Sequence, residues 1–209
     1  MIENIDNIEL QFLTLNDYKQ LKEVMIEAYS SMPDSYWKES HIESLIDKFP
    51  EGQVVIKINN QLAGCALSIL VNQSKIDEHQ TYNEITSNCT FDTHKPNGQI
   101  LYGIDIFIKP EFRGLRLARR LYDYRKELCE KLNLKAIAFG GRIPNYHQYE
   151  DEISPKEYIE KVRRKEIVDP VLNFQISNDF HPSKILKGYL EEDKQSSEYA
   201  VLLKWDNIY

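Results

Sequence analysis

The sequence has few residues of the kinds that mark secreted or unstructured chains. It contains three cysteines, eight glycines and eight prolines in 209 residues. Cys65, Cys89 and Cys129 form no CxxC pair and no cysteine–histidine ligand set, so we expect no structural zinc site and reduced thiols in a cytoplasmic protein. The glycine and proline content is too low for a low-complexity chain.

Long apolar runs are also missing. The longest, Leu62–Val71, has only about half the length of a membrane-spanning helix. The N-terminus carries Glu3, Asp6 and Glu9 where a signal peptide has an apolar core. We therefore expect neither a membrane partner nor secretion.

Positive charge is scarce overall but concentrated in one segment. The formal net charge is -7, which disfavours a nucleic-acid partner, because nucleic-acid surfaces are usually basic. The concentrated cations are Arg113, Arg116, Arg119, Arg120, Arg125 and Lys126. On charge alone this segment is typical of a solvated helix face, and a site for a small polyanion is the alternative.

The apolar pattern predicts a mixed α/β (α+β) fold in a single domain, residues 1–209. Strands are predicted over Ile8–Leu15, Gln53–Ile58, Leu62–Val71, Ile100–Lys109, Leu134–Phe139, Ser183–Leu190 and Glu198–Trp205. Helices are predicted over Asn16–Ser30, Ser40–Phe49, Phe112–Leu132, Ser154–Lys165 and Val171–Asn178. The polar stretch Gln73–Gly98 is predicted to be a long irregular excursion, which in a compact domain is often functional.

The strand Ile100–Lys109 runs into a tight turn that opens a helix. The first turn of a helix has unpaired backbone N–H groups and the positive end of the helix dipole, a combination that binds phosphate. Gly114 permits close approach of the backbone to a ligand. Coenzyme A, with its pyrophosphate and further phosphate, suits this arrangement. A plain strand–turn–helix connection is the alternative.

The turn Arg113–Ala118 resembles motif A of the GNAT acyltransferases, where a strand is followed by Arg/Gln-x-x-Gly-x-Gly/Ala. Arg113 and Ala118 match in register, whereas Arg116 stands at the central glycine position. Four further strings are similar to GNAT domains that are joined to carbon–nitrogen hydrolases: Leu101–Asp105, Gly140–His147, Asp169–Gln175 and Ser196–Ala200. Since these 209 residues contain no hydrolase sequence, a separately encoded carbon–nitrogen hydrolase is a candidate partner.

The resemblance implies a mostly antiparallel central sheet flanked by helices. It implies an N-acyltransferase that moves an acetyl or other acyl group from acetyl-CoA or another acyl-CoA directly to a primary amine of a small molecule or peptide. The backbone of Ile106, Phe107 and Ile108 would pair with the pantetheine arm. The pyrophosphate would contact Arg113, Gly114, Leu115, Arg116, Leu117, Ala118 and Arg119.

Direct transfer needs a base for the amine, a donor for the carbonyl oxygen and an acid for the leaving thiolate. Asp105 is the leading base, because a carboxylate in the middle of an apolar strand is unusual without a functional role. Partial burial there would raise its pKa toward a useful value. A structural aspartate is the alternative. His94, in the excursion, is a second candidate, with a solvated loop histidine as its alternative. Tyr189 or Tyr146 would serve as the acid.

Arg142 and Asn145 follow the strand Leu134–Phe139, where the sheet of this family opens. They would bind a carboxylate or carbonyl of the acceptor, with Tyr146 beside them, unless they only cap the turn. The insertion, about residues 142–170, would wall this site.

Two departures from the family leave a second function open. The helix tyrosine of the family is replaced by Phe174-Gln175, and Arg116 interrupts motif A. A catalytically silent acyl-CoA-binding or partner-binding module is therefore the alternative to an enzyme. No metal is expected, because the spacing of Asp92, His94 and Asp105 matches no ligand motif.

Overall fold

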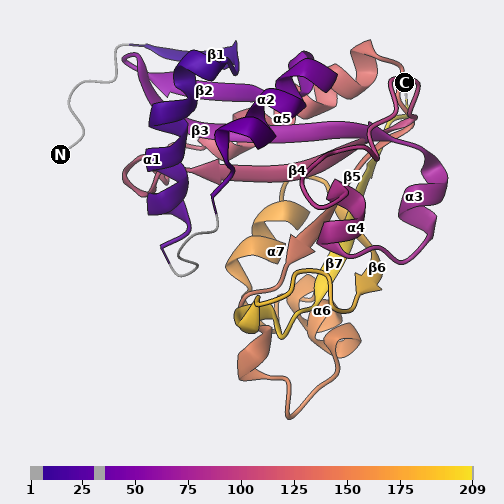
Figure 1. Cartoon of the computed structure of the whole chain (residues 1–209). Helices are drawn as coiled ribbons and strands as arrows, with labels where there is room; N and C mark the ends of the chain where they lie inside the picture. Colours follow the sequence, from indigo (N-terminus) through magenta and orange to yellow (C-terminus); the bar gives the residue numbers. More distant parts are fainter. Residues whose placement is uncertain (1–6, 31–35, 209) are drawn as a thin grey trace.

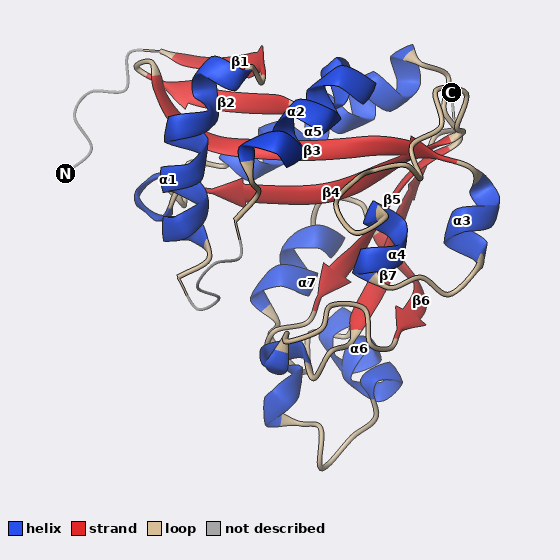
Figure 2. Ribbon diagram, in the orientation of Figure 1, coloured by secondary structure: helices blue, strands red, loops and turns tan. Residues whose placement is uncertain are grey.

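The computed structural model describes residues 7–30 and 36–208. Seven strands in these residues form one sheet in the order β1-β2-β3-β4-β5-β7-β6 (Figures 1 and 2). Their bounds are β1 Ile8–Phe12, β2 Val54–Ile58, β3 Gln61–Val71, β4 Ile100–Ile108, β5 Ala136–Arg142, β6 His181–Leu186 and β7 Ala200–Asp206. Every neighbouring pair is antiparallel except β4 and β5. The predicted mixed, mostly antiparallel sheet is confirmed.

Helices cover both faces of the sheet. Their bounds are α1 Tyr18–Ala28, α2 Glu39–Lys48, α3 Gln73–Asp77, α4 Tyr82–Thr86, α5 Leu117–Lys131, α6 Pro155–Arg163 and α7 Pro170–Ile176. Leu21 of α1 and Leu45 of α2 lie in the core on one face. Leu121 of α5 packs beside β2 on the other face, and Tyr158 of α6 and Leu172 of α7 complete that side near β5 and β7. No described helix is long and apolar enough to cross a bilayer.

Local capping explains where the C-terminal helices begin. The Ser154 hydroxyl accepts a hydrogen bond from the Glu157 N–H at 3.2 Å, and Pro155 occupies the first turn of α6. The Asp169 carboxylate accepts from the N–H groups of Val171 and Leu172 at 3.0 and 2.9 Å. Both caps satisfy backbone donors that a helix leaves unpaired, and the predicted positions of these helices are confirmed to within a few residues.

The excursion Gln73–Gly98 is more regular than predicted. It contains α3 and α4, so the prediction of an irregular segment is wrong. Thr81 and Glu84 form a capping box at the start of α4, with the Thr81 N–H donating to the Glu84 carboxylate at 2.8 Å. Burial of Ile85 then holds this short helix on the core.

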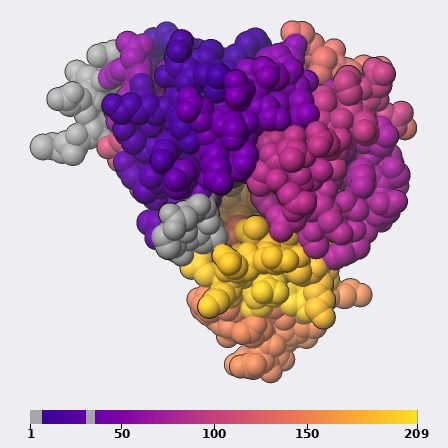
Figure 3. Space-filling model, in the orientation of Figure 1, coloured from indigo at the N-terminus to yellow at the C-terminus, as the bar shows by residue number. Residues whose placement is uncertain are grey.

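The excursion is tied to the C-terminal segment. Lys184 Nζ donates to the carbonyls of Ile76, Asp77 and Glu78 at 2.9, 2.9 and 2.7 Å. The Tyr82 N–H donates to the Tyr189 carbonyl at 2.6 Å. In Figure 3 the two segments, magenta and yellow, lie against each other. The excursion therefore forms part of one face of the molecule.

Two other predicted boundaries are wrong. The helix expected over Phe112–Leu132 begins only at Leu117, because Gly114 (φ +88°) and Arg116 (φ +59°) have left-handed backbone conformations that interrupt helical geometry. The strand expected over Ser183–Leu190 ends at Leu186, so Tyr189 lies outside it.

Candidate active site

The candidate site is a gap in the sheet between β4 and β5. The two strands pair only where Ile100–Tyr102 meets Ala136–Ala138. Beyond that point β4 continues beside β3, and β5 continues beside β7 to Arg142. Among the described residues, the β5-facing edge of β4 therefore has no strand partner over its C-terminal half (Figure 1). A β-bulge between Leu67 and Ser68 in the β3–β4 pairing lies where the strands separate, and such bulges bend a strand.

Arg125 of α5 fills the bulge. Its Nη2 donates to the carbonyls of Leu67 and Asp105 at 2.8 and 2.6 Å, and its Nε donates to the Ser68 hydroxyl at 3.1 Å. The side chain is buried, and a Cβ at Gly103 would lie 2.9 Å from Arg125 Nη1. The guanidinium thus satisfies backbone carbonyls that the bulge removes from regular pairing.

Asp105 lies at the gap on the opposite face of β4 and is held by three donors. Its Oδ1 accepts a short hydrogen bond from the Tyr29 hydroxyl and another from the Ile106 N–H at 2.8 Å. Its Oδ2 accepts from Trp37 Nε1 at 3.0 Å. Burial raises the pKa of Asp105, and the hydrogen bonds from Tyr29 and Trp37 partly oppose that rise. Asp105 as a residue is only partly buried, so it lies at the edge of the gap and not deep in the core.

Three tyrosines line the same face. The hydroxyls of Tyr102 and Tyr189 are 2.8 Å apart, and the Tyr82 hydroxyl donates to the Ile104 carbonyl at 3.2 Å. Burial raises the pKa of Tyr102 to about 12 and that of Tyr189 well above its usual range. A Cβ at Gly140 would lie 2.2 Å from Tyr189 Cζ, so the glycine lets this ring pack directly on the β5 backbone.

The cationic turn lies at the start of α5. Arg113, Arg116, Arg119 and Arg120 are exposed, and none of them forms an ion pair with a described residue. A Cβ at Gly114 would meet no atom within 4 Å, so this glycine is needed for its positive φ. The Arg113 guanidinium donates to the Ala28 carbonyl at 3.5 Å. The turn therefore lies beside the end of α1 that carries Tyr29.

His94 is not brought to the gap. Its Nδ1 accepts from the Leu70 N–H at 3.1 Å, and its ring stacks on Phe49. Leu70 pairs with Leu101, within the part of β4 where the sheet is still closed. The structure separates His94 from Asp105 along the strand.

Arg142 reaches the gap but already has a partner. Its Nε and Nη2 donate to the Asp193 carboxylate at 2.7 and 2.5 Å, and Nη2 also donates to Gln195 at 3.2 Å. Burial acts to lower the pKa of Arg142, but the hydrogen bond and charge of Asp193 raise it overall. The guanidinium stays positively charged, and its Nη1 makes none of these contacts.

Asn145 and Tyr146 form their hydrogen bonds within the insertion. The Asn145 N–H donates to Asp169 at 3.2 Å and its side-chain amide donates to the Val168 carbonyl at 3.0 Å. Tyr146 is buried and donates to the Ile153 carbonyl at 3.1 Å. The contacts of Asn145 are those expected of a residue that caps the turn, and Tyr146 packs within the insertion.

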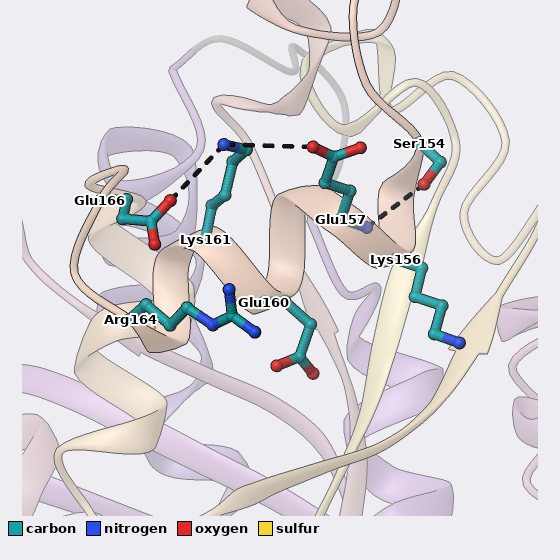
Figure 4. Close-up of a pocket in the computed structure, with 7 residues that line it drawn as sticks. All are labelled: Ser154, Lys156, Glu157, Glu160, Lys161, Arg164 and Glu166. Atoms are coloured by element: carbon teal, nitrogen blue, oxygen red, sulfur yellow. Dashed lines mark hydrogen bonds and ion pairs between the residues drawn. The ribbon is translucent and has the colours of Figure 1, made fainter.

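A shallow hollow on the surface of α6 lies away from this chemistry. Figure 4 shows that its lining residues come from one helix and its flanks. Lys161 lies 4.0 Å from Glu157 and 3.5 Å from Glu166 in two ion pairs. No group of three or more His, Cys, Asp or Glu side chains among the described residues could hold a metal ion.

The residues that sequence reasoning missed are the partners of Asp105. Tyr29 and Trp37 are 76 and 68 positions away from it, and no local pattern connects such distances. Arg125 did carry a signal, since it falls on the same helical stripe as Leu117, Leu121 and Leu128. An arginine on an apolar stripe indicates a buried role.

Comparisons with known proteins agree with this geometry. The family described as "Acetyltransferase (GNAT) family" matches residues 18–150. "Probable hydrolase YhcX" of Bacillus subtilis (strain 168) is 41% identical over 172 residues, which are 82% of this chain and 34% of that protein. "Uncharacterized N-acetyltransferase YkwB" of the same organism is 34% identical over 173 residues, 83% of this chain and 76% of that protein. The chain thus spans about a third of the first relative's length.

A solved structure has the same fold. The loading GNATL domain of CurA from Lyngbya majuscula superposes with a TM-score of 0.83 at 20% identity, covering 96% of this chain and 98% of that one.

Proposed function

The chain belongs to the Acetyltransferase (GNAT) family and is an acyltransferase, and on that premise we propose that it moves an acetyl or other acyl group from acyl-CoA directly to a primary amine. The observation that supports this most is the unpaired edge of β4, which ends at a cationic turn and runs past the Asp105 carboxylate.

The residues present fit an acyl-CoA donor. The amides of the pantetheine arm can pair with an unpartnered strand edge, which Ile106, Phe107 and Ile108 provide. The N-terminus of α5 opens at Leu117 beside exposed arginines, so the pyrophosphate would lie on the N–H groups from Leu115 to Arg119. Arg116 is exposed and its guanidinium is directed to the solvent side of the turn. Its side chain can therefore pair with a phosphate oxygen.

Asp105 and Tyr189 supply the proton transfers. The amine nitrogen attacks the thioester carbonyl carbon, and a backbone N–H of β4 stabilises the oxyanion that forms. Asp105 is the base that finally holds the amine proton. The carbon–sulfur bond then breaks, and Tyr189, which stays protonated because burial raises its pKa, donates to the thiolate.

One experiment separates this enzyme from a silent acyl-CoA-binding module. We would measure thiol release from acetyl-CoA over a panel of primary amines, and CoA binding by calorimetry. Turnover with at least one amine supports the proposed function. Tight CoA binding without turnover favours the silent module, and absence of CoA binding contradicts both.

We also propose that a carbon–nitrogen hydrolase is a partner of this chain. The support is the similarity to a relative described as a probable hydrolase, of which this chain matches only part. Affinity purification of the tagged chain from its own cells, followed by mass spectrometry, should recover such a hydrolase; recovery of none would contradict the proposal.

A further inference from the structure

The hydroxyl of Tyr29 contacts Asp105 directly at the end of α1. Tyr29 follows the last residue of α1, and its ring packs edge-on against Phe107 of β4 with 5.8 Å between ring centroids. Its hydroxyl donates to Asp105 Oδ1. Phe107 is part of the strand edge proposed for the donor, so Tyr29 packs against the same stretch of β4 that carries Asp105.

The Asp105 carboxylate has few acceptor positions left for further hydrogen bonds. A carboxylate offers about four acceptor positions, and Asp105 already accepts from Tyr29, Ile106 and Trp37. Both positions on Oδ1 are taken. The Tyr29 oxygen, by contrast, uses its proton toward Asp105 and keeps its lone pairs for a further donor.

We propose that Tyr29 is a catalytic residue, which receives a proton from the acceptor amine and passes its own proton to Asp105. This rests on the proposed function. As the nitrogen bonds to the acyl carbon, the N–H bond breaks and its proton moves to the Tyr29 oxygen, while the Tyr29 hydroxyl proton moves to Oδ1. The carbon–sulfur bond breaks, the CoA thiolate takes its proton from Tyr189 as above, and the amide leaves with Asp105 protonated. The phenolate never accumulates, because one proton arrives as the other leaves.

The surroundings of Asp105 allow its titration to be followed. The ionisable groups whose charges act on it are Tyr29 after α1, Cys65 of β3, Tyr82 of α4 and Arg142 of β5 and, from the other face of the sheet, Tyr122 and Arg125 of α5. Burial raises the pKa of the thiol and of the phenols, and arginine stays charged. The lower limb of the pH–rate profile therefore reports Asp105.

The test is the Tyr29→Phe variant, which keeps the ring contact with Phe107 and removes only the hydroxyl. We expect kcat to fall about 100-fold or more at every pH, with acetyl-CoA affinity unchanged, since positioned proton transfer contributes on that scale. If Tyr29 only positions Asp105, the limb shifts to higher pH but the plateau rate at high pH returns to the wild-type value, which would overturn the relay. An unchanged profile would overturn it as well.

A double-mutant cycle with Asp105→Asn provides a second readout. Two groups in one relay act as a unit, so the double variant should be no slower than the slower single variant, whereas independent roles would multiply the losses. Tyr124→Phe on α5 is the matched control, because it also removes one phenol hydrogen bond, to the Glu51 carbonyl, and should keep full activity. Failure of wild-type turnover would reject the proposed function; normal turnover with a fully active Tyr29→Phe would reject only the relay.

Discussion

Replacement of Arg125 by methionine tests whether the guanidinium in the bulge maintains the site. Arg125 is 2% exposed and donates to two backbone carbonyls on two different strands. Methionine can fill much of the space but donates nothing. The carbonyls of Leu67, a fully buried residue, and of Asp105, a partly buried one, would therefore lose their donor.

The expected loss of stability follows from these two carbonyls. An unsatisfied buried acceptor costs about 1–3 kcal/mol, so two cost about 2–6 kcal/mol. Removal of a buried cation that has no described carboxylate partner offsets part of this, on the order of 1–2 kcal/mol. We expect the free energy of unfolding to fall by about 0–5 kcal/mol, with about 2–3 kcal/mol as the middle of the range.

Arg125→Met should also change the titration of Asp105. Burial raises the pKa of this carboxyl, and the charge of Arg125 is among the effects that lower it. Without that charge the pKa rises further, so the lower limb of the pH–rate profile moves to higher pH.

Urea unfolding and the pH dependence of kcat/KM check both effects. Lys131→Met is the control, because Lys131 is an exposed cation on the same helix and should change neither quantity. A variant as stable as the wild type, with an unshifted limb, would refute the role assigned to Arg125.

Three further changes are informative. Arg116→Gly should stabilise the chain by about 1 kcal/mol in a thermal unfolding assay, because a left-handed backbone favours glycine; a large loss of CoA affinity on calorimetry would identify Arg116 as a phosphate ligand. Asp105→Asn should keep CoA affinity but lose rate, most strongly below neutral pH, where the amine stays protonated unless a base acts; unchanged kinetics would remove Asp105 from the mechanism. Gly140→Ala should destabilise the chain by about 1–3 kcal/mol in urea, because its Cβ would overlap the buried Tyr189 ring; wild-type stability would show that the ring moves freely.

Much of the fold follows from local patterns in the sequence. Apolar periodicity identified the strands and the main helices, because side chains repeat every two residues on a strand and every 3.6 on a helix. Ser154-Pro155 indicates one helix start through its capping group, and the structure places α6 there. The left-handed geometry at Arg116 was beyond such patterns, since arginine has no preference for it.

The candidate site depended far more on tertiary structure. The sequence by itself placed Asp105 on a strand beside a cationic turn, because that relation is local. Only the folded sheet decided that the carboxylate meets Tyr29 and Trp37 from the other end of the chain, and that His94 lies elsewhere. The physical reason is that strand pairing and the bulge filled by Arg125 set these contacts, and both join residues that are far apart in sequence.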